Sequence, residues 1–292
     1  MARTARRRFP GRAPAALLRD RLDPAYRVCD AVRTRRPAGR PGCGEIGRLL
    51  LTTTGIEAAP APDRSRRAAV EAVVLDMDGT LLDTEGAYRA AFLDAAAALG
   101  HAVDGAFYAT LVGVSSRDRG PLVSARYGPG FPWAECLRGY RARKARLLAG
   151  GVRAKPGAAE LLAECAARGL PCAVATSATR RTALSALDKA GLLGAFAALA
   201  ARDDVDAGKP HPALFLRAAA ALGVPPPRCL AVEDSPPGVL AARAAGMNVV
   251  MVPDALPPPL EPQRAGLAVA ADLLEVRALL RRSLRDREGD AT

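Results

Sequence analysis

Several features that other protein classes depend on are scarce in this sequence. No run of 18 apolar residues occurs among its 292 residues, so we predict no membrane-spanning helix. It has only two histidines, and His211 is better interpreted as a loop residue than as a metal ligand. The cysteines show no metal-ligand spacing and are typical of reduced thiols in a cytoplasmic protein; they are Cys29, Cys43, Cys136, Cys165, Cys172 and Cys229. These absences leave little basis for a zinc site or a thiol nucleophile.

Positive charge is plentiful but unevenly distributed. The chain carries 42 Lys or Arg against 30 Asp or Glu, and its 50% hydrophobic content excludes a largely disordered protein. Residues 1–70 hold 16 Arg and 6 acidic residues, a net charge of +10 out of +12, so the rest of the chain is nearly neutral. We therefore predict that residues 1–68 form an Arg-rich, disordered extension, and we expect no nucleic-acid binding by the remainder. The alternative is that this arm itself binds nucleic acid or another anionic partner.

An apolar run near residue 72 ends at two carboxylates, Asp76 and Asp78, followed by Gly79. Such a run is typical of a buried parallel strand that ends in a sharp turn, and ligands of open α/β sheets bind at such carboxyl ends. Strand alternation would send both carboxylates to the same side, where they repel each other unless they share a cation or a proton. A calcium loop is a poor alternative because Leu81 and Leu82 stand where it needs oxygen ligands. The pattern therefore favours a divalent metal at this turn.

Three later segments also carry polar or charged side chains that would suit an active site. Four apolar residues lead into Thr176 and Ser177, Lys209 lies in a Gly-Lys-Pro sequence, and another apolar run ends at Glu233 and Asp234. Each has an ordinary alternative: a hydroxyl pair is more often a helix N-cap, the lysine can stand there by chance, and an acidic pair is more often a solvated turn. Only four of the 42 basic residues are lysines, which favours a specific role for Lys209. The four motifs are informative together, in this order and at separations of 100, 33 and 25 residues.

Together these motifs resemble those of the haloacid dehalogenase-like (HAD) hydrolases, in the branch of phosphatases and β-phosphoglucomutase, over roughly residues 70–280. The resemblance implies that Asp76 is a nucleophile that forms an aspartyl-phosphate. It implies that Asp78 protonates the leaving oxygen and later deprotonates the attacking water. Thr176 and Ser177 would hold the phosphoryl oxygens, and Lys209 would bridge the phosphate and Asp76.

The same resemblance implies a Mg²⁺ site. Its ligands would come from the carboxylates Asp76, Asp78, Glu233 and Asp234, whose hard oxygen atoms suit Mg²⁺ better than zinc. The segment 113–118 resembles the part of β-phosphoglucomutase relatives that contacts the substrate, which makes Arg117 a candidate substrate-binding residue. An exposed Arg at the start of a helix is an equal alternative.

Helical and strand patterns alternate in the order that a doubly wound parallel sheet requires. After the first strand we expect strands at 172–175, 197–200, 230–232 and 249–252, with helices at 158–168, 180–190, 212–222 and 237–245. Residues 85–155 show only helical patterns, at 88–99, 107–112, 117–127 and 133–148, and resemble the family's small helical cap. We therefore predict an α/β core from 69–84 and 156–284, a cap from 85–155 and a flexible tail from 285–292.

The resemblance implies a Mg²⁺-dependent phosphatase that acts on a small phosphorylated metabolite, with a sugar phosphate as the favoured class. We expect a cytoplasmic monomer. A phosphomutase is the alternative with the same fold. β-Phosphoglucomutase-like enzymes have a cap histidine twelve residues after the nucleophile that helps to suppress attack by water, whereas Tyr88 stands at that place here. This difference favours hydrolysis over return of the phosphoryl group to the sugar.

Overall fold

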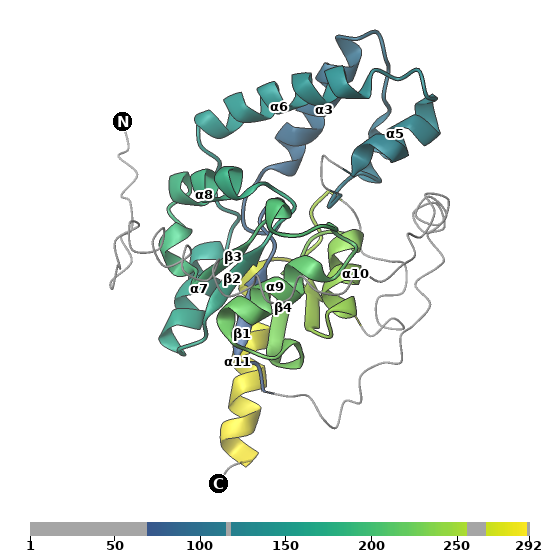
Figure 1. The fold of residues 1–292 in the computed structure, drawn as a ribbon. Coiled ribbons are helices and arrows are strands. Elements are labelled where there is room, and N and C mark those ends of the chain that lie inside the picture. Colours follow the sequence, from purple (N-terminus) through teal and green to yellow (C-terminus); the bar gives the residue numbers. More distant parts are fainter. Residues whose placement is uncertain (1–68, 115–117, 256–266, 291–292) are drawn as a thin grey trace, which may run out of the picture.

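The computed structural model describes residues 69–114, 118–255 and 267–290 (Figure 1). Within them a parallel sheet has the strand order β3-β2-β1-β4-β5-β6. The strands are β1 (Ala72–Leu75), β2 (Cys172–Ala175), β3 (Ala198–Ala200), β4 (Cys229–Glu233), β5 (Asn248–Met251) and β6 (Ala268–Val269). β1 lies near the centre, hydrogen-bonded to β2 on one side and to β4 on the other. The predicted α/β class with a parallel sheet is confirmed.

Helices cover both faces of the sheet because its strands are apolar on both sides. Val73 and Leu75 belong to the core cluster under α7 (Ala158–Ala167), α8 (Arg180–Lys189) and α11 (Leu273–Asp290). Ala72 and Val74 belong to the cluster under α9 (Ala213–Leu222) and α10 (Pro236–Ala244). A strand buried on both faces has a continuous apolar sequence, which explains why β1, β2 and β4 could be predicted.

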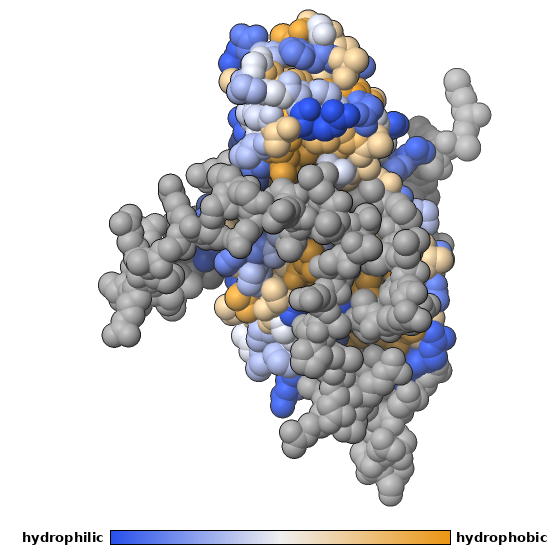
Figure 2. Space-filling view, turned by 90° about the vertical axis from the view of Figure 1, so that its right-hand side faces the viewer, coloured by the Kyte–Doolittle hydropathy of each residue, from blue (hydrophilic) through white to orange (hydrophobic). Residues whose placement is uncertain are grey.

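A helical insertion, which we call the cap, lies between β1 and α7 and is drawn at the top of Figure 1 and of Figure 2. Its helices are α3 (Glu85–Ala97), α4 (Gly105–Ala109), α5 (Arg119–Tyr127) and α6 (Trp133–Ala149), and α3 packs along α6. Phe92 lies in its interior, with its ring centroid 5.4 Å from that of Tyr108 and 5.7 Å from that of Tyr140. Such aromatic packing gives the cap a hydrophobic interior of its own.

The chain passes from core to cap and back at two adjacent points. Leu82 on the way out forms an antiparallel bridge with Ala154 on the way back. The Asp83 N–H donates to the Arg153 carbonyl at 3.0 Å. The cap is therefore joined to the core by two chain segments that pair with each other next to the turn that follows β1.

The C-terminal elements β6 and α11 were not predicted. α11 packs on α7 and continues to Asp290, into the residues for which we predicted a flexible tail. Glu164 of α7 joins the two helices, since its carboxylate accepts hydrogen bonds from Arg281 and Arg168 at 2.7 Å and from Arg277 at 3.1 Å. These hydrogen bonds lower the pKa of Glu164 to about 2. Among the helices of the described residues, none is long and apolar enough to cross a membrane.

Candidate active site

The carboxyl ends of three adjacent strands bring the first, second and fourth motifs together. Asp76 follows β1, Thr176 follows β2, and Glu233 ends β4 with Asp234 directly after it. The Asp76 N–H donates to the Val232 carbonyl at 3.0 Å, so the pairing with β4 continues past the end of β1. All four of the polar side chains are buried. Burial of this kind is costly unless the groups bind one another or a ligand.

The turn after β1 requires a glycine. Gly79 has a φ of +87°, in the left-handed region that other residues rarely adopt. A side chain at this position would also collide with the carboxylate of Asp234. Thr80, the next residue, donates its hydroxyl hydrogen to Asp234 Oδ1 at 3.4 Å. The turn is thereby held directly against the fourth motif.

Lys209, from the loop between β3 and α9, places a cation among the acids. Its ammonium donates to both Asp76 and Glu233. Burial favours the neutral amine, but the two carboxylates outweigh this effect and raise the pKa of Lys209, which stays charged. The other oxygen of Glu233 accepts from the N–H groups of Asp234 and Ser235 and from the Ser235 hydroxyl, at 3.0–3.2 Å. Glu233 thus fixes Lys209 and the start of α10.

The acids form a compact group that suits a divalent cation. Asp76, Glu233 and Asp234 each offer a carboxylate oxygen within 4.8 Å of the other two. Burial and the neighbouring carboxylates raise the pKa of Asp76 and of Asp234, although Lys209 offsets part of this rise. Asp234 Oδ2 is buried without a hydrogen-bond partner in the described part of the chain. An unpartnered carboxylate oxygen beside two further acids fits a hard cation such as Mg²⁺.

Asp78 lies apart from this group and faces the cap. Its Oδ2 is 3.9 Å from the ammonium of Lys144 in α6, and that ammonium lies 3.7 Å from the ring centroid of Tyr88. Asp78 Oδ1 is buried and has no hydrogen-bond partner among the residues described. Strand alternation does not fix this side chain because β1 ends at Leu75 and Asp78 already belongs to the turn. Of the four acids expected at a metal, Asp78 is thus the one outside the compact group.

The hydroxyls of the second motif lie on the same edge of the sheet. Thr176 Oγ1 accepts from the Ala178 N–H at 3.0 Å, and a hydroxyl oxygen that accepts can still donate its own hydrogen to a ligand. Ser177 donates to the carbonyl of Gly113 in the cap at 3.0 Å. Ser177 therefore joins the core to the cap beside the pocket, whereas Arg117 lies outside the described residues.

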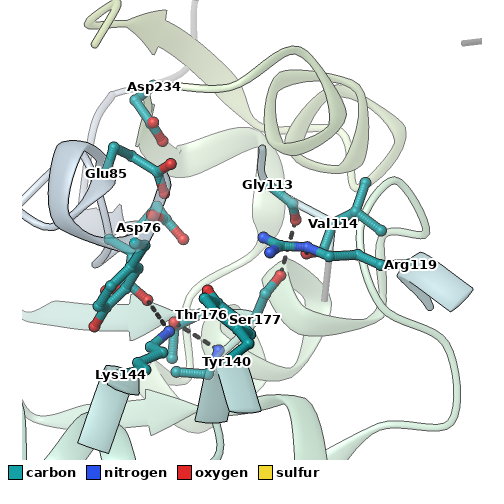
Figure 3. Close-up of a pocket in the computed structure, with 13 residues that line it drawn as sticks. Asp76, Glu85, Gly113, Val114, Arg119, Tyr140, Lys144, Thr176, Ser177 and Asp234 are labelled. Carbon is teal, nitrogen blue, oxygen red and sulfur yellow. Dashed lines mark hydrogen bonds and ion pairs between the residues drawn. The ribbon is translucent and has the colours of Figure 1, made fainter. Parts of the chain in front are cut away.

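One pocket is lined by side chains of the cap and by Asp76, Asp78, Thr176, Ser177 and Asp234 of the core (Figure 3). The cap contributes Glu85 from α3, Arg119 from α5, and Tyr140 and Lys144 from α6. None of these four was predicted as a site residue. Glu85 closes the first motif and Arg119 follows the predicted Arg117 by two residues, so a sequence signal existed for both. Tyr140 and Lys144 reach the pocket only through the packing of α6.

Arg119 is held in one orientation inside the pocket. Its side chain is buried, its Nε donates to the Val114 carbonyl at 2.9 Å, and its guanidinium lies 5.8 Å and 5.7 Å from the ring centroids of Tyr108 and Tyr140. Its Nη1, and Oε2 of Glu85, are buried without partners among the described residues. Burial, helped by Asp78, raises the pKa of Glu85 to about 7, although Arg119 opposes the rise. A fixed donor and an acid with unmet hydrogen bonds are groups that a polar ligand would satisfy.

Comparison with known proteins agrees with the motifs. Residues 70–246 match the family described as haloacid dehalogenase-like hydrolase. Protein CbbY of Rhodobacter capsulatus is 37% identical over 196 residues, which cover 63% of this chain and 86% of that protein. Hexitol phosphatase B of Escherichia coli is 32% identical over 195 residues, which cover 62% of this chain and 83% of that protein.

A similar solved structure is CbbY from Rhodobacter sphaeroides in complex with phosphate. It aligns with a TM-score of 0.58 and 30% identity, and the alignment covers 71% of this chain and 96% of that one. The family match spans more than half of the chain and includes all four motifs. The chain therefore belongs to the haloacid dehalogenase-like hydrolases, in their branch of phosphatases and β-phosphoglucomutase-like enzymes.

Proposed function

We propose that the protein is a Mg²⁺-dependent phosphatase that hydrolyses a small sugar phosphate or sugar-alcohol phosphate through an aspartyl-phosphate on Asp76. The main support is the contrast between two acids near one pocket. Asp76 is buried against Lys209, whereas Asp78 faces the cap with an unpartnered oxygen. The ammonium of Lys209 favours the ionised form of Asp76 that a nucleophile needs, whereas an acid that exchanges protons needs a different environment. The relative named hexitol phosphatase B supports the same reaction class, and the phosphate bound to CbbY supports a phosphate ligand.

In the first step, Asp76 attacks the phosphorus and the substrate's oxygen leaves. Repulsion between the carboxylate and the anionic phosphoryl group opposes this attack, so the site must supply positive charge and alignment. Lys209 supplies charge next to the nucleophile, and the Thr176 hydroxyl can donate to a phosphoryl oxygen. Asp78 gives its proton to the leaving oxygen, which departs as a neutral alcohol. A Mg²⁺ ion held by Asp76 and Asp234 would neutralise further charge on the phosphoryl oxygens.

In the second step, water attacks the phosphorus of the aspartyl-phosphate and inorganic phosphate is released. Asp78, now ionised, takes a proton from that water, which restores both acids to their starting forms. Tyr88 does not compete as a base, because burial and the nearby Asp78 raise its pKa and keep the phenol neutral. Asp78 thus carries the proton in both steps, and position 88 provides no second base.

The leaving group would lie against the cap. Arg119 offers a fixed donor, Glu85 an acidic oxygen and Tyr140 a phenol on that side of the pocket. A polyhydroxylated chain carries several donors and acceptors at short spacing and can satisfy these groups, whereas an apolar leaving group would leave them unpaired. This complementarity supports a sugar or sugar-alcohol phosphate over an aryl or alkyl phosphate.

Phosphate release from a panel of phosphorylated metabolites, with Mg²⁺ or with a chelator, tests this function. We expect turnover of sugar or hexitol phosphates that requires Mg²⁺. Asp76→Asn keeps the size of the side chain and removes the nucleophile, so it should retain less than about a hundredth of wild-type turnover. Asp94→Asn, the same change on the exposed face of α3, is the matched control and should retain full activity. Substantial turnover by Asp76→Asn would exclude a covalent intermediate on that residue.

A further inference from the structure

A second polar contact between cap and core lies outside the pocket. Asp118, at the start of α5, accepts from Arg202 of the core: Nε is 3.2 Å from Oδ2, and Nη2 is 3.3 Å and 3.2 Å from Oδ1 and Oδ2. The Arg202 side chain is 7% exposed and that of Asp118 is 38% exposed. A guanidinium that meets a carboxylate through two nitrogens fixes direction as well as distance.

The same guanidinium organises the loop that leads to Lys209. Arg202 lies in a short 3₁₀ helix (Arg202–Asp204) directly after β3. Its Nη1 donates to the Val205 carbonyl at 2.8 Å, and its Nη2 donates to the Asp206 carbonyl at 3.3 Å. The loop backbone is therefore attached to a buried side chain only three residues before Lys209.

Gly208, the residue before Lys209, packs directly on the ion pair. A methyl group built on Gly208 would lie 2.9 Å from Arg202 Nε and 3.0 Å from Asp118 Oδ2. Contacts this short require one of the groups to move. The carboxylate of the cap, the guanidinium of the core and the backbone beside Lys209 thus occupy one closely packed unit.

We infer that Asp118 and Arg202 are positioning residues for Lys209. When the cap covers the pocket, Asp118 contacts Arg202, which fixes residues 205–208 and holds the Lys209 ammonium against Asp76. The pair couples the position of the cap to the charge beside the nucleophile, and it acts through the loop because neither residue lines the pocket. The effect on catalysis that we infer rests on the proposed phosphatase function. The coupling of the cap to the loop does not depend on that function.

Hydrogen exchange measured by mass spectrometry tests the coupling without any substrate. Asp118→Asn removes the negative charge that faces Arg202. It should speed hydrogen exchange in the core residues 202–210 as well as in α5. Asp104→Asn is the matched control, because Asp104 pairs with Arg126 inside the cap, 3.7 Å away. This control should leave exchange in residues 202–210 unchanged. If Asp118→Asn speeds exchange in the cap alone, the coupling does not exist.

Kinetics with p-nitrophenyl phosphate and Mg²⁺ test the effect on Lys209. Asp118→Asn should lower kcat about 10- to 100-fold, the size of effect that a small misplacement of a reacting group produces, with a smaller change in KM. Gly208→Ala keeps both charges but pushes the pair apart, so it should have the same effect. The double variant should be no worse than either single one, because both disturb one unit.

The melting temperatures separate positioning from general stability. Asp118→Asn and Asp104→Asn should lower the melting temperature by similar, small amounts, yet only Asp118→Asn should lower kcat. Equal kcat values for the two variants would overturn the positioning role. If wild-type protein releases no phosphate at all, the proposed function has failed, and the exchange experiment still decides whether Asp118 and Arg202 couple the cap to the loop.

Discussion

Replacing Asp78 with Asn should separate its chemistry from its contribution to stability. Asn has the same size, Oδ1 has no hydrogen-bond partner to lose among the described residues, and Oδ2 makes a single ionic contact, 3.9 Å from Lys144. Partly exposed ion pairs of this kind contribute about 1 kcal/mol or less. In a chain of this size that free energy corresponds to a fall in melting temperature of about 2–4 °C. The fold should therefore persist.

The expected loss of activity in Asp78→Asn is much larger. General acid and base catalysis contributes roughly 10²- to 10⁴-fold to rate, which is about 3–5 kcal/mol of barrier. Turnover of a sugar phosphate should fall by this factor, because its alcohol leaves only with a proton. With p-nitrophenyl phosphate the phenolate leaves without one, so the first step should survive while attack by water on the aspartyl-phosphate slows.

Rapid-mixing measurements can detect this difference between the two steps. Asp78→Asn should release up to one equivalent of p-nitrophenol per site in a fast phase, followed by slow steady turnover, and mass spectrometry of the quenched protein should find the phosphoryl group on Asp76. Scanning calorimetry on the same sample measures the change in melting temperature. If the variant keeps more than about a tenth of wild-type turnover on a sugar phosphate, Asp78 is not the general acid. If it unfolds instead, the structural account of Asp78 is wrong.

Three further outcomes are expected. Glu164→Gln should lower the free energy of unfolding by about 1–2 kcal/mol at pH 7, a value reduced for partial exposure of the arginines. This loss of stability should shrink as pH falls from 4.5 towards 2, because Glu164 is protonated near pH 4.5 in the unfolded chain but only near pH 2 in the folded one. Equal losses of unfolding free energy in urea titrations at pH 7 and pH 3 would contradict this. A chain that starts at Ala68 should keep its Mg²⁺-dependent turnover, and any nucleic-acid binding should weaken with salt and disappear with the arm; salt-resistant binding by the shortened chain would favour the anionic-partner hypothesis. β-Glucose 1-phosphate, followed by phosphorus NMR, should yield inorganic phosphate without a bisphosphate activator, and predominant glucose 6-phosphate would identify a mutase.

The parts of the fold that were predictable from sequence are those with a local signal. β1, β2 and β4 are buried on both faces, so each is a continuous apolar run that ends at a polar motif. β6 has two residues and no such run, and its placement depends on the contact with β5. α11 had a local signal that we did not use, because its buried residues Leu273, Val276 and Leu280 lie at helical spacing.

The residues of the candidate site also fall into those with a local sequence signal and those without one. Asp76, Thr176 and Asp234 follow strands directly, so the parallel sheet alone brings them to one edge. Lys144 and Arg119 come from helices of the cap, and their approach to that edge depends on how the whole insertion packs over the core. We selected Arg117 from the segment 113–118, which ends one residue before Arg119, and Arg117 itself lies outside the described residues.

The order of strands in the sheet has a consequence for how the chain is assembled during synthesis. Val73 of β1 pairs with Cys172 and Leu230, so both partners of the central strand are synthesised long after it. The cap helices α3 and α6 lie between these segments in the sequence and contact each other, so they can pack first. Asp76 and Asp234 then meet only when β4 joins the sheet. The repulsion between the buried acids can therefore arise only after Lys209 has been synthesised, and its ammonium can offset that repulsion.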